Sequence, residues 1–212
     1  MMSQICVIDT GTSNIKSIVN AITHLGFEPK VVNKDHEIIK AKCIILPGVG
    51  SFDKVMKSIK AHNLVQPLNN AVIKNKIPIL GICIGMQILF NLSDEGKEVG
   101  LNLIDGNIKK LIYKKETFHK VPNNGFREVF FSPSNPLISK EIQKEHLYFN
   151  HSFGLLSKEF KYKHDVFIHN NQFVASFNHK NIFGMQFHPE KSQQFGLFLL
   201  KNFIQISLNL SK

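Results

Sequence analysis

The chain has 212 residues, 43% of them hydrophobic, and a formal net charge of +10. That length can bury the core of one domain, and no apolar run approaches the roughly 18 residues of a membrane-spanning helix. The charge is typical of nucleic-acid-binding proteins, yet Arg127 is the only arginine among the 26 basic residues. Because base-reading surfaces depend on arginine, we expect neither a nucleic-acid nor a membrane partner.

The three cysteines are widely spaced, at Cys6, Cys43 and Cys83, and form no C-x-x-C pair or Cys/His pair at zinc-ligand spacing. We therefore expect no metal site. Sparse thiols are typical of the reducing cytosol, and the first residues lack the basic region of a signal peptide. The sequence thus predicts a cytoplasmic protein.

The first half of the chain has the rhythm of strand, helix and strand. Residues 5–8 predict a strand, and apolar residues at spacings of three and four from Ile15 predict a helix that Gly26 closes. Residues 31–32 and 43–46 predict the next strands. This order predicts an α/β fold with a doubly wound, mostly parallel sheet flanked by helices.

From residue 108 onward the pattern changes to short apolar or alternating segments, at 108–113, 128–131, 148–149 and 173–177. These segments predict an additional, smaller antiparallel β layer. A strand at 182–187 and a C-terminal helix with Phe195, Phe198, Leu199 and Phe203 on its apolar face complete the chain. No linker or repeat interrupts it, so we expect a single domain over residues 1–212.

Cys83 lies where an apolar run, residues 77–80, passes through G-x-C-x-G into the helical pattern 84–90. Such a turn is the cysteine version of the nucleophile elbow, with small neighbours at Gly81 and Gly85. The thiol then lies at a helix N-terminus that favours a thiolate, and the Ile84 N–H faces the position of a tetrahedral oxyanion. A buried structural cysteine is the alternative interpretation.

His188-Pro189-Glu190 favours the catalytic interpretation of Cys83. In an extended segment, residues two apart project to the same side, and Pro189 disfavours a helix at His188. Glu190 can then orient the imidazole while its other nitrogen faces Cys83, as acyl transfer requires. His151 is either structural or near the cleft, and we favour a structural role.

Two motifs, residues 81–87 (GICIGMQ) and 186–192 (QFHPEKS), resemble those of class I (triad) glutamine amidotransferases. Three more stretches are similar to the glutaminase subunits of imidazole glycerol phosphate synthase: Asp9-x-Gly-x-x-Asn14, residues 47–50 (PGVG), and Tyr148-Phe149-x-His151-Ser152. The resemblance runs nearly end to end. It implies the class I glutamine amidotransferase fold.

The resemblance also implies roles for single residues. Cys83 attacks the side-chain amide of L-glutamine, His188 moves the protons and Glu190 orients His188. The backbone amides of the oxyanion hole come from Val49, Gly50 and Ile84, and the substrate is held by Gln87 and Glu95. Ammonia then passes to a (β/α)8-barrel cyclase (HisF-type) subunit in a heterodimer that serves histidine biosynthesis. No cofactor is implied.

One segment departs from the family pattern. Where the family usually has Pro-His-Met-Gly-Trp-Asn, this chain has residues 122–127, PNNGFR. The resemblance implies that this segment and a preceding loop face the partner, through Asn14, Asn123, Asn124, Phe126 and Arg127. Two alternatives stay open: a paralogue that supplies ammonia to another acceptor, such as an amidinated surface sugar, and an idle interaction protein. The complete Cys, His and Glu set argues against the second.

Overall fold

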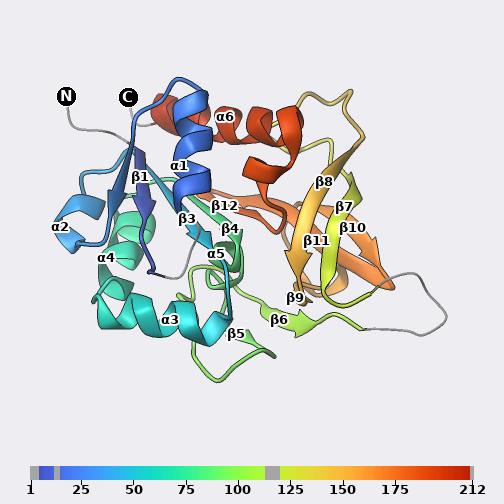
Figure 1. Cartoon of the computed structure of the whole chain (residues 1–212), viewed down its shortest axis with the longest axis horizontal. Helices are drawn as coiled ribbons and strands as arrows, with labels where there is room; N and C mark the ends of the chain where they lie inside the picture. Colours follow the sequence, from blue (N-terminus) through green and yellow to red (C-terminus); the bar gives the residue numbers. More distant parts are fainter. Residues whose placement is uncertain (1–4, 12–14, 113–119, 211–212) are drawn as a thin grey trace.

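The computed structural model describes residues 5–11, 15–112 and 120–210, built around a nine-stranded sheet (Figure 1). The strand order is β2-β1-β3-β4-β12-β11-β10-β7-β8. Pairing is parallel from β2 to β12 and antiparallel from β12 to β8. The strands are β1 Ile5–Ile8, β2 Pro29–Val32, β3 Cys43–Gly48, β4 Ile79–Cys83, β7 Asn123–Phe130, β8 Lys144–His151, β10 His164–His169, β11 Asn171–His179 and β12 Ile182–Met185.

The parallel half of the sheet is covered by helices on both faces. Helices α1 (Ile15–His24) and α6 (Gln193–Leu210) lie on one face, and α3 (Phe52–Ala61) and α4 (Val65–Asn69) on the other (Figure 1). Strands β1, β3 and β4 are therefore buried along their whole length, as continuous apolar runs require. The predicted doubly wound α/β class is confirmed.

The antiparallel strands extend the same sheet, and a separate three-stranded sheet lies beside them, in the order β5-β6-β9. It comprises β5 Leu92–Ser93, β6 Asn107–Lys110 and β9 Phe153–Gly154. The apolar pattern did not indicate β10, because His164, Asp165 and His169 interrupt its apolar residues. The short helical elements are α2 Asp35–Ile38, η1 Asn70–Lys74, α5 Ile84–Gln87, η2 Ser157–Glu159 and η3 Pro189–Lys191.

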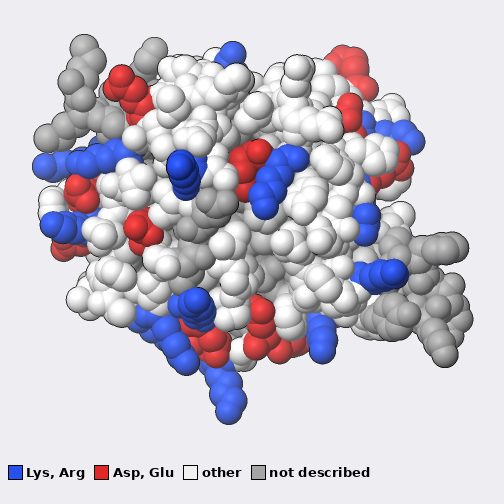
Figure 2. All heavy atoms as spheres, viewed as in Figure 1, with Lys and Arg blue, Asp and Glu red and all other residues white. Residues whose placement is uncertain are grey.

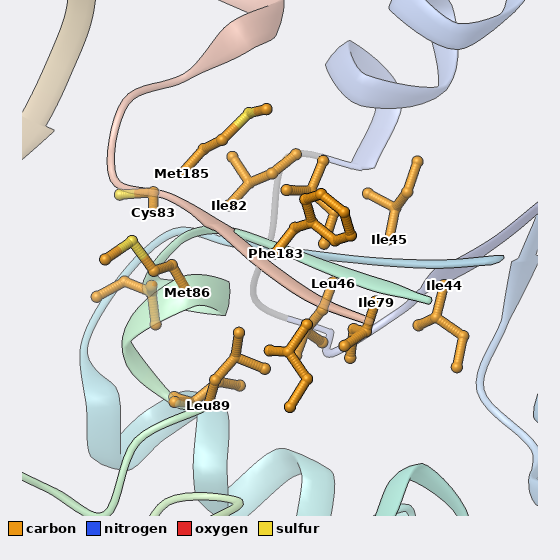
Figure 3. Packing of buried hydrophobic residues seen from close by; sticks show 14 of the residues in the cluster. Ile44, Ile45, Leu46, Ile79, Ile82, Cys83, Met86, Leu89, Phe183 and Met185 are labelled. Carbon is orange, nitrogen blue, oxygen red and sulfur yellow. The ribbon is translucent and has the colours of Figure 1, made fainter. Parts of the chain in front are cut away.

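The core is apolar, and the surface carries charges of both signs. Apolar side chains of β3, β4 and β12 pack together, and Cys83 lies at the border of this cluster (Figure 3). On the face seen in Figure 2, acidic side chains lie among the basic ones. Across residues 5–11, 15–112 and 120–210, no helix is long and apolar enough to cross a membrane.

The turn after β4 depends on a very close approach of two backbones. A Cβ atom added at Gly85 would lie 1.8 Å from the carbonyl oxygen of Leu46 in β3. A Cβ at Gly81 would lie 2.5 Å from the carbonyl oxygen of Gly85. Because these obstacles are backbone atoms, one in β3 and the other in α5, they cannot rotate away as a side chain could. Helix α5 can thus pack against β3 only without side chains at these two positions.

We predict that Gly85→Ala lowers the free energy of unfolding by about 3 kcal/mol or more, at the upper end of overpacking effects. Gly26→Ala is the control, because no atom lies within 4 Å of its added Cβ although its φ is +85°. An alanine held in this left-handed backbone conformation costs roughly 1–2 kcal/mol by itself. Denaturant unfolding of both variants measures the difference, and equal losses would contradict the packing argument.

Candidate active site

Cys83 is the last residue of β4 and has a strained backbone, with φ 55° and ψ −112°. A non-glycine residue with positive φ is uncommon, and such strain persists only where the surrounding structure enforces it. Here the enforcing contacts are those of Gly81 and Gly85 with their neighbouring backbones. The predicted elbow is present, although α5 ends at Gln87 and so spans one turn rather than residues 84–90.

The sheet register brings His188 to the same place. Strand β12 pairs with β4 so that Met185 lies opposite Ile82, and the chain leaves β12 beside the elbow. The His188 N–H donates to the Tyr148 carbonyl at 2.9 Å, and the Ser192 hydroxyl donates to the His188 carbonyl at 2.7 Å. Hydrogen bonds to Tyr148 in β8 and to Ser192 thus fix the backbone of His188.

Glu190 orients the His188 ring as the sequence predicts, but by a different local geometry. His188 Nδ1 lies 2.9 Å from Glu190 Oε1, and the two side chains are 3% and 9% exposed. The expectation of an extended segment through Glu190 is wrong, because Pro189–Lys191 form a 3-10 turn. Proline at the first position of the turn has the φ angle that the turn requires.

Electrostatics favour a charged His188 imidazole beside Cys83. Burial by itself lowers the pKa of His188, but attraction to Cys83 and a hydrogen bond with it, followed by the Glu190 carboxylate, outweigh burial and raise the pKa to about 10. Burial instead raises the pKa of Cys6 to about 11 and that of Cys43 to about 12. Attraction to Lys30 lowers the pKa of Cys6 but does not outweigh burial there. Cys83 instead lies next to a strongly basic, protonated imidazole, the arrangement found at reactive cysteines.

A cavity of about 220 Å³ opens in front of Cys83. Its volume exceeds that of an engineered cavity of about 150 Å³ that admits benzene, so one small molecule fits. The sequence-predicted residues on its wall are Cys83, His188, Val49, Gly50, Ile84, Gln87 and Glu95. Glu190 lies behind His188 and contacts it from outside the cavity wall. The structure therefore brings the predicted catalytic, oxyanion-hole and substrate positions together.

Glu95 is held in place by the start of α3. Its Oε2 atom accepts the Phe52 N–H at 2.8 Å, and burial, the largest effect, raises the pKa of its carboxyl. The Asp53 carboxylate accepts the backbone N–H groups of Lys97 and Glu98, each at 2.9 Å. The first turn of α3 thus clamps the loop that carries Glu95.

His151 has the predicted structural role and also borders the cavity. Its Nδ1 atom lies 2.7 Å from the Phe153 carbonyl, which can only accept, so Nδ1 carries the proton. Nε2 then accepts from Asn123 Nδ2 at 3.1 Å. Burial lowers the pKa of His151 to about 3, so the ring is neutral. It supports the cavity wall.

The proposed partner segment is only partly exposed. Phe126 is 42% exposed and stacks edge-on against Tyr148, and Asn124 lies on the surface and accepts the Tyr148 hydroxyl at 2.9 Å. The Arg127 guanidinium donates to the Phe126 carbonyl at 2.8 Å. Asn123 is a correction: its side chain is fully buried against His151 and cannot contact a partner. Asn14 lies outside the described residues.

Two further residues at the site were not assigned a role from the sequence. Gln186 is fully buried with its Nε2 atom 3.9 Å from Cys83 Sγ, and the Asn150 carbonyl lies 3.9 Å from the same sulfur. Gln186 precedes His188 by two positions, and that period of two could have placed both on one side. The position of Asn150 follows from the pairing of β7 with β8, which the sequence does not specify.

We predict that iodoacetamide at pH 7 alkylates Cys83 before Cys6 and Cys43 in the folded protein. Because the pKa of His188 is raised to about 10, a positive charge stays beside the Cys83 sulfur at neutral pH and is lost as the pH rises through about 10. His188→Ala should slow the labelling of Cys83 at pH 7, whereas His62→Ala, at an exposed position, should not. Peptide mapping measures this, and preferential labelling of Cys6 or Cys43 would contradict it.

Comparison with known proteins agrees with this geometry. The family described as glutamine amidotransferase class-I matches residues 6–206. The imidazole glycerol phosphate synthase subunit HisH 2 of Methanococcus maripaludis is 40% identical over 201 residues, which cover 95% of this chain and 98% of that protein. Subunit HisH of Leptospira borgpetersenii is 36% identical over 201 residues, with coverages of 94% and 98%.

Among solved structures, PurLQS from Thermotoga maritima has a TM-score of 0.70 at 21% identity, covering 100% of this chain and 100% of that one. A likeness at this identity concerns the fold alone, whereas the two sequence relatives define the narrower group. The chain therefore belongs to the class I glutamine amidotransferase family and, within it, to the HisH-type subunits of imidazole glycerol phosphate synthase.

Proposed function

We propose that this chain hydrolyses L-glutamine and passes the ammonia to a cyclase subunit that makes imidazole glycerol phosphate in histidine biosynthesis. The observation that carries the proposal is the cavity in which Cys83 faces His188, with Glu190 bonded to the far side of the imidazole. Nucleophile, base and orienting carboxylate in this order are the requirement for acyl transfer from an amide.

In the first half of the reaction, the Cys83 thiolate attacks the side-chain amide carbon of glutamine. The carbonyl oxygen becomes an oxyanion that the backbone N–H groups of Ile84 and of Val49 or Gly50 stabilise. Protonated His188 gives its proton to the amide nitrogen, and the C–N bond breaks as ammonia leaves. The product on the enzyme is a γ-glutamyl thioester.

In the second half, neutral His188 takes a proton from water, and the hydroxide attacks the thioester carbon. The C–S bond breaks, glutamate leaves and the thiolate faces an imidazolium again. Glu190 keeps the same imidazole nitrogen bonded throughout, so the other nitrogen serves both steps. No cofactor is needed for this balance of atoms.

The substrate is held by Gln87 and Glu95. Gln87 Nε2 donates to the Phe153 carbonyl at 2.8 Å and to Gln186 Oε1 at 3.0 Å, while its own buried Oε1 has no partner among the described residues. A buried acceptor without a partner favours binding a donor. The Glu95 carboxylate, which also lines the cavity, suits the α-ammonium group of glutamine.

The partner that fits best is a (β/α)8-barrel cyclase of the HisF type in a heterodimer. Its docking surface comprises Asn124, Phe126 and Arg127 on β7, together with Asn14, which lies outside the described residues. The exposure of Phe126 supports this assignment, because large apolar residues often anchor interfaces. We further infer that residues 1–212 act as one domain in the cytoplasm.

The proposal is tested by glutamine hydrolysis with three samples: the purified chain, the chain with its neighbouring barrel protein, and both with the nucleotide substrate of the barrel. The family resemblance implies that the loop at residues 47–50 can misdirect one oxyanion donor until that ligand binds. One such donor changes the rate by about a hundred- to a thousandfold, and we predict stimulation of this size only in the third sample.

Cys83→Ala is the matched variant for this experiment. It should abolish glutamine hydrolysis while the complex still makes its product from added ammonia, because only the nucleophile is lost. Full hydrolysis by the isolated parent chain would refute the coupling. Stimulation by the barrel without its nucleotide would instead indicate a paralogue with another ammonia acceptor.

We also predict that Asp53→Ala raises the KM for glutamine about tenfold with little change in kcat, because two N–H groups in the Glu95 loop lose their charged acceptor. Glu98→Ala is the control, since it removes one acidic charge from the same loop and breaks its ion pair with Lys60 but leaves the clamp intact. Steady-state kinetics of the complex measure both. Equal KM values for the two variants would contradict the role of Asp53.

A further inference from the structure

A fully buried glutamine side chain next to the nucleophile requires a physical reason. Gln186 is 0% exposed and lies between the end of β12 and His188, with its backbone N–H bonded to the Ala175 carbonyl at 2.8 Å. A primary amide costs free energy to bury unless its hydrogen bonds are made. Its oxygen accepts from Gln87, but the proposed reaction steps do not use its Nε2 donor.

The orientation of the Gln186 amide follows from a group that can only accept. The Phe153 carbonyl lies 2.8 Å from the end of the Gln87 side chain and can only accept a hydrogen bond, so the Gln87 atom that faces it is the Nε2 donor. The second proton of that nitrogen points to Gln186 Oε1, at 3.0 Å. The amide of Gln186 is then fixed with its oxygen toward Gln87 and its Nε2 donor toward Cys83.

The sulfur of Cys83 consequently has different partners in its two protonation states. The Asn150 carbonyl, 3.9 Å away, can accept the proton of a thiol but repels a thiolate. Gln186 Nε2, also 3.9 Å away, donates and so favours the thiolate. A hydrogen bond to sulfur is long and weak when neutral, and it strengthens when the acceptor is charged.

We propose that Gln186 is a positioning residue for the nucleophile, which donates to the Cys83 thiolate and offsets the opposing Asn150 carbonyl. Its oxygen at the same time fixes Gln87, so the substrate contact and the nucleophile share one hydrogen-bonded chain. The proposal rests on the proposed glutaminase activity for its role in turnover. The contact with sulfur itself stands without it.

The test is the pH profile of Cys83 alkylation in Gln186→Met, a variant of similar length that lacks the donor. We expect the midpoint of the profile to rise by about one pH unit, which is a tenfold loss of thiolate at neutral pH. The other titratable or charged groups that line the cavity are His188, Glu95, His151 and Lys191, and all remain in the variant. In the complex, kcat for glutamine should fall about tenfold.

Met185→Leu is the control, because it changes a buried neighbour while conserving volume, and it should leave the profile unchanged. An unchanged profile in Gln186→Met, or an equal shift in both variants, would overturn the proposal. A shifted profile in a protein that never hydrolyses glutamine would instead retain the role of Gln186 and refute the glutaminase.

A second measurement uses the parent protein and so does not depend on the folding of a variant. The side-chain amide protons of Gln186, assigned by through-bond NMR correlations, should move downfield as Cys83 ionises, because a charged acceptor strengthens the hydrogen bond. Resonances that stay in place through the ionisation of Cys83 would overturn the proposal.

Discussion

The contact of α5 with β3 is the constraint on which the active site depends. At Gly85 the two backbones are so close that a single methyl group would overlap the Leu46 carbonyl. This approach turns the chain sharply after β4 and holds Cys83 at a positive φ. The strain is thus enforced by the packing of α5 against the sheet. The Cys83 sulfur takes its position from this turn, and His188 is brought beside it by the pairing of β12 with β4.

Surroundings, and not residue type, decide the chemistry of the three cysteines. Cys6 and Cys43 are buried inside the sheet, and desolvation dominates there and keeps both as thiols. Cys83 lies at the border of the same apolar cluster (Figure 3), where an imidazolium, a buried amide and an open cavity meet its sulfur. Cys83 differs from the two core cysteines because it ends its strand, next to the His188 imidazole and the cavity.

The sequence predicted the features that follow from local residue patterns, namely the parallel strands and the turn at Cys83. Parallel strands are continuous apolar runs, so β1, β3 and β4 could be read directly, and the elbow follows from two glycines around Cys83. What depends on strand pairing could not be predicted. Whether Asn123 faces inward is set by the phase of β7 against β8, and the 3-10 turn at Glu190 is set by contacts with Ser192 and Tyr148.

The central claim is that Cys83 is the nucleophile toward the side-chain amide of glutamine. The most direct measurement uses a glutamine analogue that carries an electrophilic carbon in place of that amide, followed by mass spectrometry of the labelled peptides. The account predicts one label per chain, on Cys83, which free glutamine prevents and which leaves ammonia-dependent synthesis by the complex intact. A label on Cys6 or Cys43, or labelling that glutamine does not slow, would contradict it.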